Sequence, residues 1–317
     1  MRVRILVNPV ASSVSPRRVE RLRVALAREH RVDVVDTVAR GHARTLAGTA
    51  ADEGVDVVVV AAGDGTLNEA ANGLLGSPTA LAPYPGGSTN VYARAVGYGN
   101  HPDRATDRLV DALTHGSIRH LGVGAAGERR FLFHLGAGFD AAVVARMEAR
   151  HRNQLVKRYA AHPAFALATL RTLARSDRSR PTIRVEAPGL APHDSHFTVV
   201  SNLAPYSYVG PRRMVLTRGA GPDRALALTS MQRFGLSDVA AAFGSSVARA
   251  AHLRRDPDVV QWEDLGEITL HGVDDQPFPW QVDGDHLGST DSLTVRFEPK
   301  ALAVVLPRWP AGPPSAP

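Results

Sequence analysis

Residues 55–69 have the sequence VDVVVVAAGDGTLNE, and this stretch decides the class of fold. The apolar, largely β-branched run 55–62 indicates a strand that is buried on both faces of a parallel sheet. The chain then turns through Gly63-Asp64-Gly65-Thr66 and continues as a helix. Free backbone amides and the helix dipole attract anions at a helix N-terminus. The stretch therefore predicts a phosphate site held by Gly63, Gly65 and Thr66.

Asp64 is the unusual member of this turn, because a carboxylate beside a phosphate is repulsive. It is useful there when it accepts a proton or orients Mg²⁺. An aspartate in this position can also form a turn or cap a helix. Asp64 is thus a candidate catalytic or metal-orienting residue, with a purely structural role as the alternative.

A second strand, glycine turn and helix follow at 79–83, 85–89 and 90–96. Neighbouring strands of a parallel sheet end at the same edge, so both turns can face one nucleotide. The residues of this second turn expected to complete the nucleotide pocket are Gly86, Gly87, Thr89 and Asn90. Asn8, at the end of the first predicted strand, would reach the same nucleotide; alternatively, it only forms a turn before Pro9.

Strands and helices alternate before about residue 122, which predicts a Rossmann-like parallel α/β nucleotide-binding domain. The expected strands are 2–7, 31–36, 55–61 and 79–83, and the expected helices are about 16–29, 40–53, 66–75, 88–95 and 102–115.

Residues 123–300 favour a larger antiparallel β-sandwich with helical insertions at about 139–175 and 236–252. Its expected strands are 130–135, 182–186, 196–201, 225–229, 267–271, 279–283 and 292–297. Residues 310–317, rich in proline, are expected to form a disordered tail.

The composition is that of a soluble, intracellular globular protein, with 44% hydrophobic residues and no cysteine. No signal peptide or membrane-spanning segment is apparent. The net charge of +6 favours an anionic partner. Nucleic acid is the weaker choice, and no nucleic-acid partner is expected, because the chain lacks nucleic-acid-binding motifs and has only 6% aromatic residues. The scattered histidines predict no metal site.

Basic residues border an apolar stretch, 159–170, within the segment 146–180. Such a segment can lie on an anionic membrane surface, or it can be a packed helix with a basic, solvated face.

Five motifs in order resemble the catalytic family of diacylglycerol kinases and sphingosine kinases, over about residues 3–306. They are Asn8-Pro9, Gly63-Asp64-Gly65-Thr66-Leu67-Asn68-Glu69, Gly86-Gly87-Ser88-Thr89-Asn90 with Ala93-Arg94, Gly136-Ala137-Gly138-Phe139-Asp140-Ala141, and Val282-Asp283-Gly284-Asp285. The resemblance implies the same two-domain plan, with a last strand near 301–306 returning to the first domain (1–122 with about 301–307).

The resemblance also implies roles for individual residues. Asp140 and Arg94 would bind the substrate, and Asp140 could equally cap the helix that follows it. Asp285 stands where the family has an acidic residue, usually Glu, with a catalytic or metal-linked role. Asp283-Gly284 beside it is also a strong hairpin signal.

Asp64 and Asp285 together would form an acid/base and Mg²⁺ site between the domains. Asp223 is a further candidate metal ligand, although the family's Asp-Gly is Asp-Arg here. A second departure is Val91, which replaces the Asp that commonly follows the Asn of the second turn.

The sequence is therefore expected to be an ATP-dependent lipid kinase that uses Mg²⁺ and phosphorylates a diacylglycerol-like alcohol. It would be cytoplasmic and bound peripherally to an anionic membrane surface, and a homodimer is left open. The alternatives are a kinase of sphingoid bases or other lipid alcohols, an NAD kinase-like enzyme, and a catalytically silent nucleotide- or lipid-binding regulator.

Overall fold

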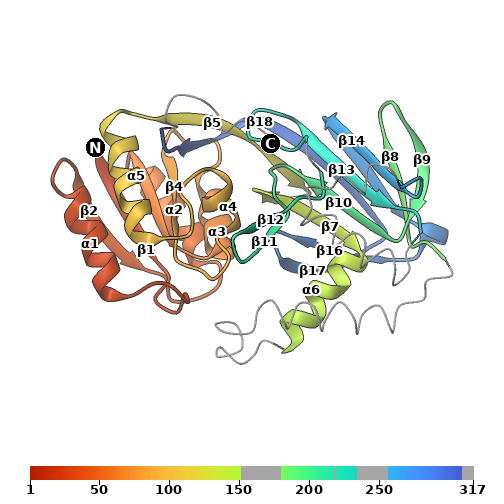
Figure 1. The fold of residues 1–317 in the computed structure, drawn as a ribbon, viewed down its shortest axis with the longest axis horizontal. Helices are drawn as coiled ribbons and strands as arrows, with labels where there is room; N and C mark the ends of the chain where they lie inside the picture. The colour runs from red at the N-terminus through yellow and green to blue at the C-terminus, as the bar shows by residue number, and fades with distance from the viewer. Residues whose placement is uncertain (151–179, 218, 234–255, 309–317) are drawn as a thin grey trace. The chain divides into compact units, whose positions relative to one another are not determined.

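The computed structural model describes residues 1–150, 180–217, 219–233 and 256–308 (Figure 1). Contacts within the chain divide it into two compact units. Unit 1 comprises Met1–Leu121 and the C-terminal segment from Lys300, and unit 2 comprises Gly122–Pro299.

Unit 1 contains a parallel sheet with the strand order β2-β1-β3-β4-β18. Its strands are β1 (Arg2–Val7), β2 (Arg31–Asp36), β3 (Val57–Ala62), β4 (Ala80–Pro85) and the end of β18 (Ser292–Val305). Every residue of β3 and β4 is buried, as expected for strands covered on both faces. The order reverses between β1 and β3, and ligands bind at such a switch point, outside the carboxyl ends of the strands.

Five helices described in unit 1 connect or follow its strands. They are α1 (Pro16–Leu26), α2 (His42–Asp52), α3 (Asp64–Leu74), α4 (Val91–Ala95) and α5 (Pro102–Thr114). Helices α2 and α3 pack closely, because Gly73 has no side chain: a Cβ there would lie 2.3 Å from the carbonyl oxygen of Arg44. Helix α1 packs against α5.

Unit 2 is an antiparallel sandwich. One sheet has the order β14-β13-β10-β7-β16-β17, and the other contains the start of β18 with β15, β8 and β9. Apolar side chains from both sheets form one core, which includes Leu135, Val200, Leu228, Ile268 and Val295. The described strands of the unit, in chain order, are β5 (Ile118–Ala126, which begins in unit 1), β6 (Arg129–Phe131), β7 (His134–Gly138), β8 (Ile183–Ala187), β9 (Leu190–Ser195), β10 (Phe197–Ser201), β11 (Ser207–Val209), β12 (Arg212–Met214), β13 (Leu226–Met231), β14 (Val259–Leu265), β15 (Glu267–Gly272), β16 (Phe278–Val282) and β17 (Asp285–Thr290).

The predicted class of fold, a parallel α/β part followed by an antiparallel sandwich, is confirmed. Several details were wrong. Helix α3 begins at Asp64, not at 66. Helix α4 begins at Val91, because Asn90 has a left-handed backbone (φ 51°). The strands expected at 292–297 and 301–306 are one strand, β18, which continues through Lys300 although its φ is 53°.

A further error concerns 130–135, expected as one strand. The chain bends there, so that β6 and β7 are separate strands. Helix α6 (Phe139–Arg150) follows β7 and lies in the first expected insertion. The rest of that insertion lies outside the described residues, and so does the second insertion. The same holds for most of the basic segment 146–180, from residue 151 to 179, and for the tail 310–317. Within the described ranges, no helix is long and apolar enough to cross a membrane.

Candidate active site

The first glycine turn lies where β3 ends and α3 begins. Gly63 is the N-cap residue of α3, and Asp64, Gly65 and Thr66 form its first turn. First-turn amides have no acceptor within their own helix and need another partner. A Cβ added at Gly65 would meet no atom within 4 Å, so the space beside this backbone is open. The turn therefore has room for an anion, and the phosphate site remains a prediction.

Asn8 and Thr66 meet at the switch point of the sheet. The Nδ2 of Asn8, just after β1, donates to the Oγ1 of Thr66 over 3.0 Å. The Oδ1 of Asn8 accepts the backbone amide of Val10 over 3.2 Å. Asn8 thus forms the turn before Val10 and also contacts the predicted phosphate turn, so its two expected roles are compatible.

Asp64 joins the first glycine turn to the second. Its Oδ2 accepts the amide of Val91 over 2.9 Å, and its Oδ1 accepts the amide of Tyr92 over 3.0 Å. These amides open α4, so Asp64 caps a helix other than its own. Burial raises the pKa of the Asp64 carboxyl, while the two amides and the charge of Arg94 oppose the increase. The structural role considered for Asp64 is therefore present.

The second glycine turn packs directly on the first. A Cβ on Gly87 would lie 2.8 Å from the Cα of Gly63, and a Cβ on Gly86 would lie 2.7 Å from the amide nitrogen of Ala62. Real side chains do not approach a backbone this closely. Gly86 is therefore required by its contact with the end of β3, and Gly87 by its contact with the first glycine turn. This reason differs from the approach of a phosphate, for which the sequence suggested them.

Asn90 stabilises the second turn from within. Its side chain accepts the amide of Gly87 over 2.7 Å and donates to the carbonyl of Gly87 over 2.9 Å. It also donates to Asn100 over 2.6 Å. The backbone carbonyl of the neighbouring Thr89 accepts a hydrogen bond from the guanidinium of Arg94 over 3.4 Å. Asn90 is therefore engaged in forming the turn, and Arg94 lies at this turn in unit 1.

In unit 2, Asp140 lies in the first turn of α6 and is buried. Tyr206 donates its hydroxyl to Oδ1 over 2.5 Å, and Gln281 donates Nε2 to Oδ2 over 2.7 Å. The imidazole ring of His134 lies 4.4 Å from the ring of Tyr206, centroid to centroid. Burial lowers the pKa of His134 to about 3, so this ring is neutral at ordinary pH.

The predicted hairpin at Asp283-Gly284 is confirmed, since both residues have positive φ (49° and 87°) between β16 and β17. The Asp283 carboxylate accepts three amides, those of Leu132, Phe133 and His134, over 2.7–3.0 Å. These bonds fix the bend between β6 and β7. Asp285 is the first residue of β17, and it forms an ion pair with Arg129 over 2.9 Å.

The three aspartates predicted to bind Mg²⁺ do not belong to a larger cluster of metal-ligating side chains within the described residues. Among them, no group of three or more His, Cys, Asp or Glu side chains could hold a metal ion. Asp64 is already bound by two amides, Asp285 is paired with Arg129, and Asp223 is exposed in the loop before β13. A Mg²⁺ ion would therefore have to compete with existing partners for the carboxylates of Asp64 and Asp285.

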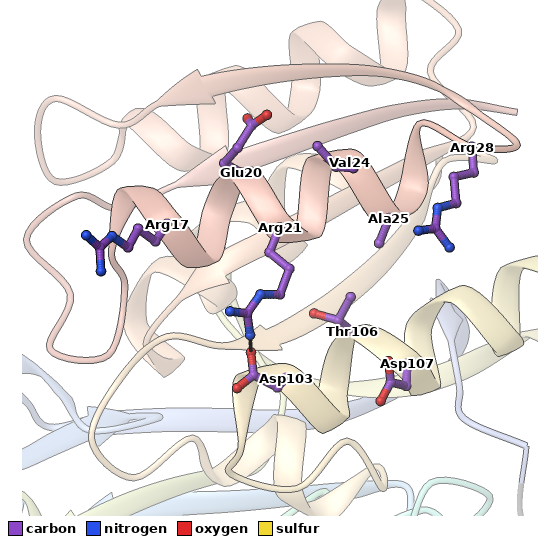
Figure 2. Close-up of a pocket in the computed structure, with 9 residues that line it drawn as sticks. All are labelled: Arg17, Glu20, Arg21, Val24, Ala25, Arg28, Asp103, Thr106 and Asp107. Carbon is purple, nitrogen blue, oxygen red and sulfur yellow. Dashed lines mark hydrogen bonds and ion pairs between the residues drawn. The ribbon is translucent and has the colours of Figure 1, made fainter.

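A surface groove between α1 and α5 is separate from these residues (Figure 2). Arg21 of α1 and Asp103 of α5 form an ion pair across it, and both side chains are largely exposed. The other lining residues are Arg17, Glu20, Val24, Ala25, Arg28, Thr106 and Asp107. No candidate site residue lines the groove, and its charges largely balance, so we assign it no role.

The sequence-based interpretation missed His134, Tyr206 and Gln281. Gln281 and His134 are polar residues within otherwise apolar strand segments, and this irregularity was a usable signal. Tyr206 lies in a loop, and no local pattern distinguishes it.

Residues 2–124 match the family model of the diacylglycerol kinase catalytic domain. This match covers the N-terminal part of the chain, and there the sequence is similar to the diacylglycerol kinase catalytic family. The matched residues include the N-terminal segment of unit 1, with both glycine turns, Asn8 and Arg94.

Two curated relatives are diacylglycerol kinases. The protein of Bacillus subtilis (strain 168) is 34% identical over 104 residues, which are 32% of this chain and 33% of the relative. That of Mycobacterium tuberculosis (strain ATCC 25618 / H37Rv) is 32% identical over 116 residues, 36% of this chain and 38% of the relative. The matches thus span little more than a third of the curated relatives.

The fold is similar over nearly the whole chain to a crystal structure of a diacylglycerol kinase from Bacillus anthracis str. Sterne. The TM-score is 0.70 at 17% identity, and the alignment covers 98% of this chain and 97% of the other. At this identity, the similarity establishes the fold of both units and no more.

Proposed function

We propose that the protein is an ATP-dependent lipid kinase that transfers a phosphoryl group to the hydroxyl of a diacylglycerol-like lipid. The observation that carries the proposal is the Asn8–Thr66 hydrogen bond across the β1/β3 switch point, directly beside the open backbone at Gly65. Nucleotides bind at this position of parallel α/β sheets. The diacylglycerol kinase catalytic domain covers the same residues.

In this proposal, Gly63, Gly65 and Thr66 bind the phosphates through the first-turn amides of α3. Asn8, Gly86, Gly87, Thr89 and Asn90 build the surrounding pocket, the glycines and Asn90 by shaping it. Asp64 holds the two turns together through Val91 and Tyr92. Magnesium enters the proposal as an ion carried by the nucleotide phosphates, since the described residues contain no group of three or more metal-ligating side chains.

Asp140 is proposed to accept a hydrogen bond from the lipid hydroxyl in unit 2, and Arg94 to contribute positive charge in unit 1. Phosphoryl transfer depends mainly on positioning and charge stabilisation. Asp64 and Asp285 are the candidates for the group that accepts the proton of the alcohol. Substitution of each residue in turn tests which of them has this role. Because a lipid with two acyl chains resides in a bilayer, peripheral membrane binding is part of the proposal.

The test is phosphoryl transfer from radiolabelled ATP to a panel of acceptors: diacylglycerol, a sphingoid base, another lipid alcohol and NAD. We expect label in diacylglycerol, and no label with an Asp64→Asn variant purified in parallel, which excludes a contaminating kinase. Label in a sphingoid base or in NAD would establish an alternative kinase. Nucleotide binding without transfer to any acceptor would establish the regulator.

A further inference from the structure

We propose that Tyr206 is a positioning residue that holds Asp140 as the hydrogen-bond acceptor for the substrate hydroxyl. This inference rests on the proposed function, because it requires that an alcohol binds at Asp140. It adds a tyrosine from an irregular loop to a site otherwise built on a helix and a strand.

The Asp140 carboxylate is held by one donor on each oxygen. Tyr206 occupies Oδ1 and Gln281 occupies Oδ2, and these are short bonds of 2.5 and 2.7 Å. A carboxylate oxygen can accept more than one hydrogen bond. The two donors therefore fix the plane of the carboxylate and leave acceptor capacity for a substrate hydroxyl.

The orientation of Gln281 follows from its second contact. The Oε1 of Gln281 accepts the amide of Gly284 over 2.8 Å, and an amide nitrogen can only donate. The Nε2 of Gln281 must therefore face Asp140 as a donor. Donors on both sides favour an ionised carboxylate, although burial raises the pKa of Asp140.

Asp140 can approach the sheet only because residue 136 is glycine. A Cβ on Gly136 would lie 1.7 Å from the Oδ2 of Asp140 and 2.6 Å from the Nε2 of Gln281. The Gly-x-Gly-x-Asp sequence thus creates the room in which the carboxylate and the glutamine amide meet. Gln281 therefore holds Asp140 from the strand, and Tyr206 holds it from the loop.

Tyr206 is itself held in place. Its amide donates to the carbonyl of Met214 over 2.9 Å, at the base of the β11–β12 hairpin, and its ring rests on the buried ring of His134. The Nδ1 of His134 is buried and has no hydrogen-bond partner. The contact between the two rings is therefore one of packing. It sets the ring position, and the hydroxyl then reaches Asp140.

Tyr206 is partly exposed, whereas Asp140 is only 4% exposed. The Tyr206 hydroxyl is the donor that reaches this buried carboxylate from the loop. Loss of a hydrogen bond to a charged group, or slight misplacement of a reacting group, reduces turnover by about ten- to hundredfold.

The experiment compares Tyr206→Phe with Tyr208→Phe in the full chain. Tyr208 lies two residues away in β11 and is buried, so the control makes the same chemical change close to Tyr206. Tyr206→Phe keeps the ring on His134 and removes only the hydroxyl. We expect kcat with diacylglycerol to fall about ten- to hundredfold, with the KM for ATP unchanged. Tyr208→Phe should retain wild-type kcat.

A second arm places Tyr206→Phe in an Asp140→Asn background. If Tyr206 acts through Asp140, it should have little further effect there, because the two substitutions remove one shared function. Full additivity in this cycle would overturn the proposal. So would wild-type kcat in Tyr206→Phe, or a higher kcat, which would mean that the tyrosine hydroxyl competes with the substrate.

Different results would overturn the proposed function and the proposed role of Tyr206. A wild-type protein that phosphorylates none of the lipids overturns the lipid kinase assignment, and this inference with it. A wild-type protein that is active while Tyr206→Phe is unaffected overturns only the role of Tyr206.

Discussion

The carboxylate of Asp64 accepts the backbone amide of Val91 over 2.9 Å, so that the glycine turn after β3 is bonded to the first residue of α4. Tyr92 donates to the other oxygen over 3.0 Å. The family motif usually has an Asp at position 91, but here only the main chain of that residue takes part. The departure at Val91 therefore leaves this link intact.

Asp64→Asn should nearly abolish phosphoryl transfer and should also destabilise unit 1. The similar shape of the two side chains suggests an intact fold, but Asn places an NH₂ group against a backbone amide. A buried donor left without an acceptor costs about 1–3 kcal/mol. Asp103→Asn is the control, because this aspartate is exposed in the same unit. Kinase assays and thermal unfolding of both variants measure the effect, and an inactive Asp64→Asn with wild-type Tm would contradict the structural part.

Gly65→Ala and Gly87→Ala should have opposite signatures. A Cβ at 65 meets open space, so we expect an unchanged Tm and weaker ATP binding, since the methyl group occupies the predicted phosphate site. A Cβ at 87 lies 2.8 Å from the Cα of Gly63, so we expect a clear loss of Tm. Calorimetric titration with ATP and thermal unfolding distinguish the two. Unaltered ATP affinity in Gly65→Ala would remove the phosphate from this turn.

Asp285→Ala should lower turnover at least about 100-fold if the carboxylate is a general base or orients a metal ion. Asp285→Glu should be tolerated, because it restores the residue type usual in the family. Arg129→Ala is the matched control, since it breaks the same partly exposed ion pair, which is worth at most about 1 kcal/mol. If Arg129→Ala is as inactive as Asp285→Ala, the ion pair matters and the chemistry of Asp285 does not.

Acid should destabilise the protein through His134. Burial lowers the pKa of His134 from 6.5 to about 3, so the unfolded chain takes up the proton first as pH falls. The free energy of unfolding is therefore not reduced by His134 above about pH 6.5. As pH falls from about 6.5 toward 3, protonation of this histidine in the unfolded chain lowers the free energy of unfolding by at most about 1.4 kcal/mol per pH unit. Urea unfolding between pH 7 and 5 should show a flatter pH dependence for His134→Asn than for wild type.

The sequence predicted those parts of the fold and site that depend on contiguous residues. The run 55–62 is uniformly apolar, and the structure has β3 at Val57–Ala62, with the glycine turn directly after it. The partners of that turn could not be predicted in this way. Asp64 bonds to residues 27 and 28 positions away, and Gly87 is needed because Gly63 lies against it. Such requirements arise only when distant segments are brought together.

The same limit applies in unit 2. The turn signal Asp283-Gly284 is local, and it gave the hairpin correctly. The bend that separates β6 from β7 is set by the Asp283 carboxylate, about 150 residues later in the chain, so the local pattern at 130–135 could not indicate it. Tyr206 meets Asp140 across 66 residues and has no sequence signal of its own.

The strand β18 has a consequence for how the chain folds during synthesis. Its last residues complete the sheet of unit 1, where Val304 pairs with Leu81 of β4 and Leu302, Ala303 and Val305 are buried. At ribosomal speeds of about 5–20 residues per second, β4 waits on the order of ten seconds or more while residues 122–299 emerge. During that time β4 is an unpaired apolar edge, open to wrong pairing with another nascent chain. The first unit to be synthesised is thus the last to be finished.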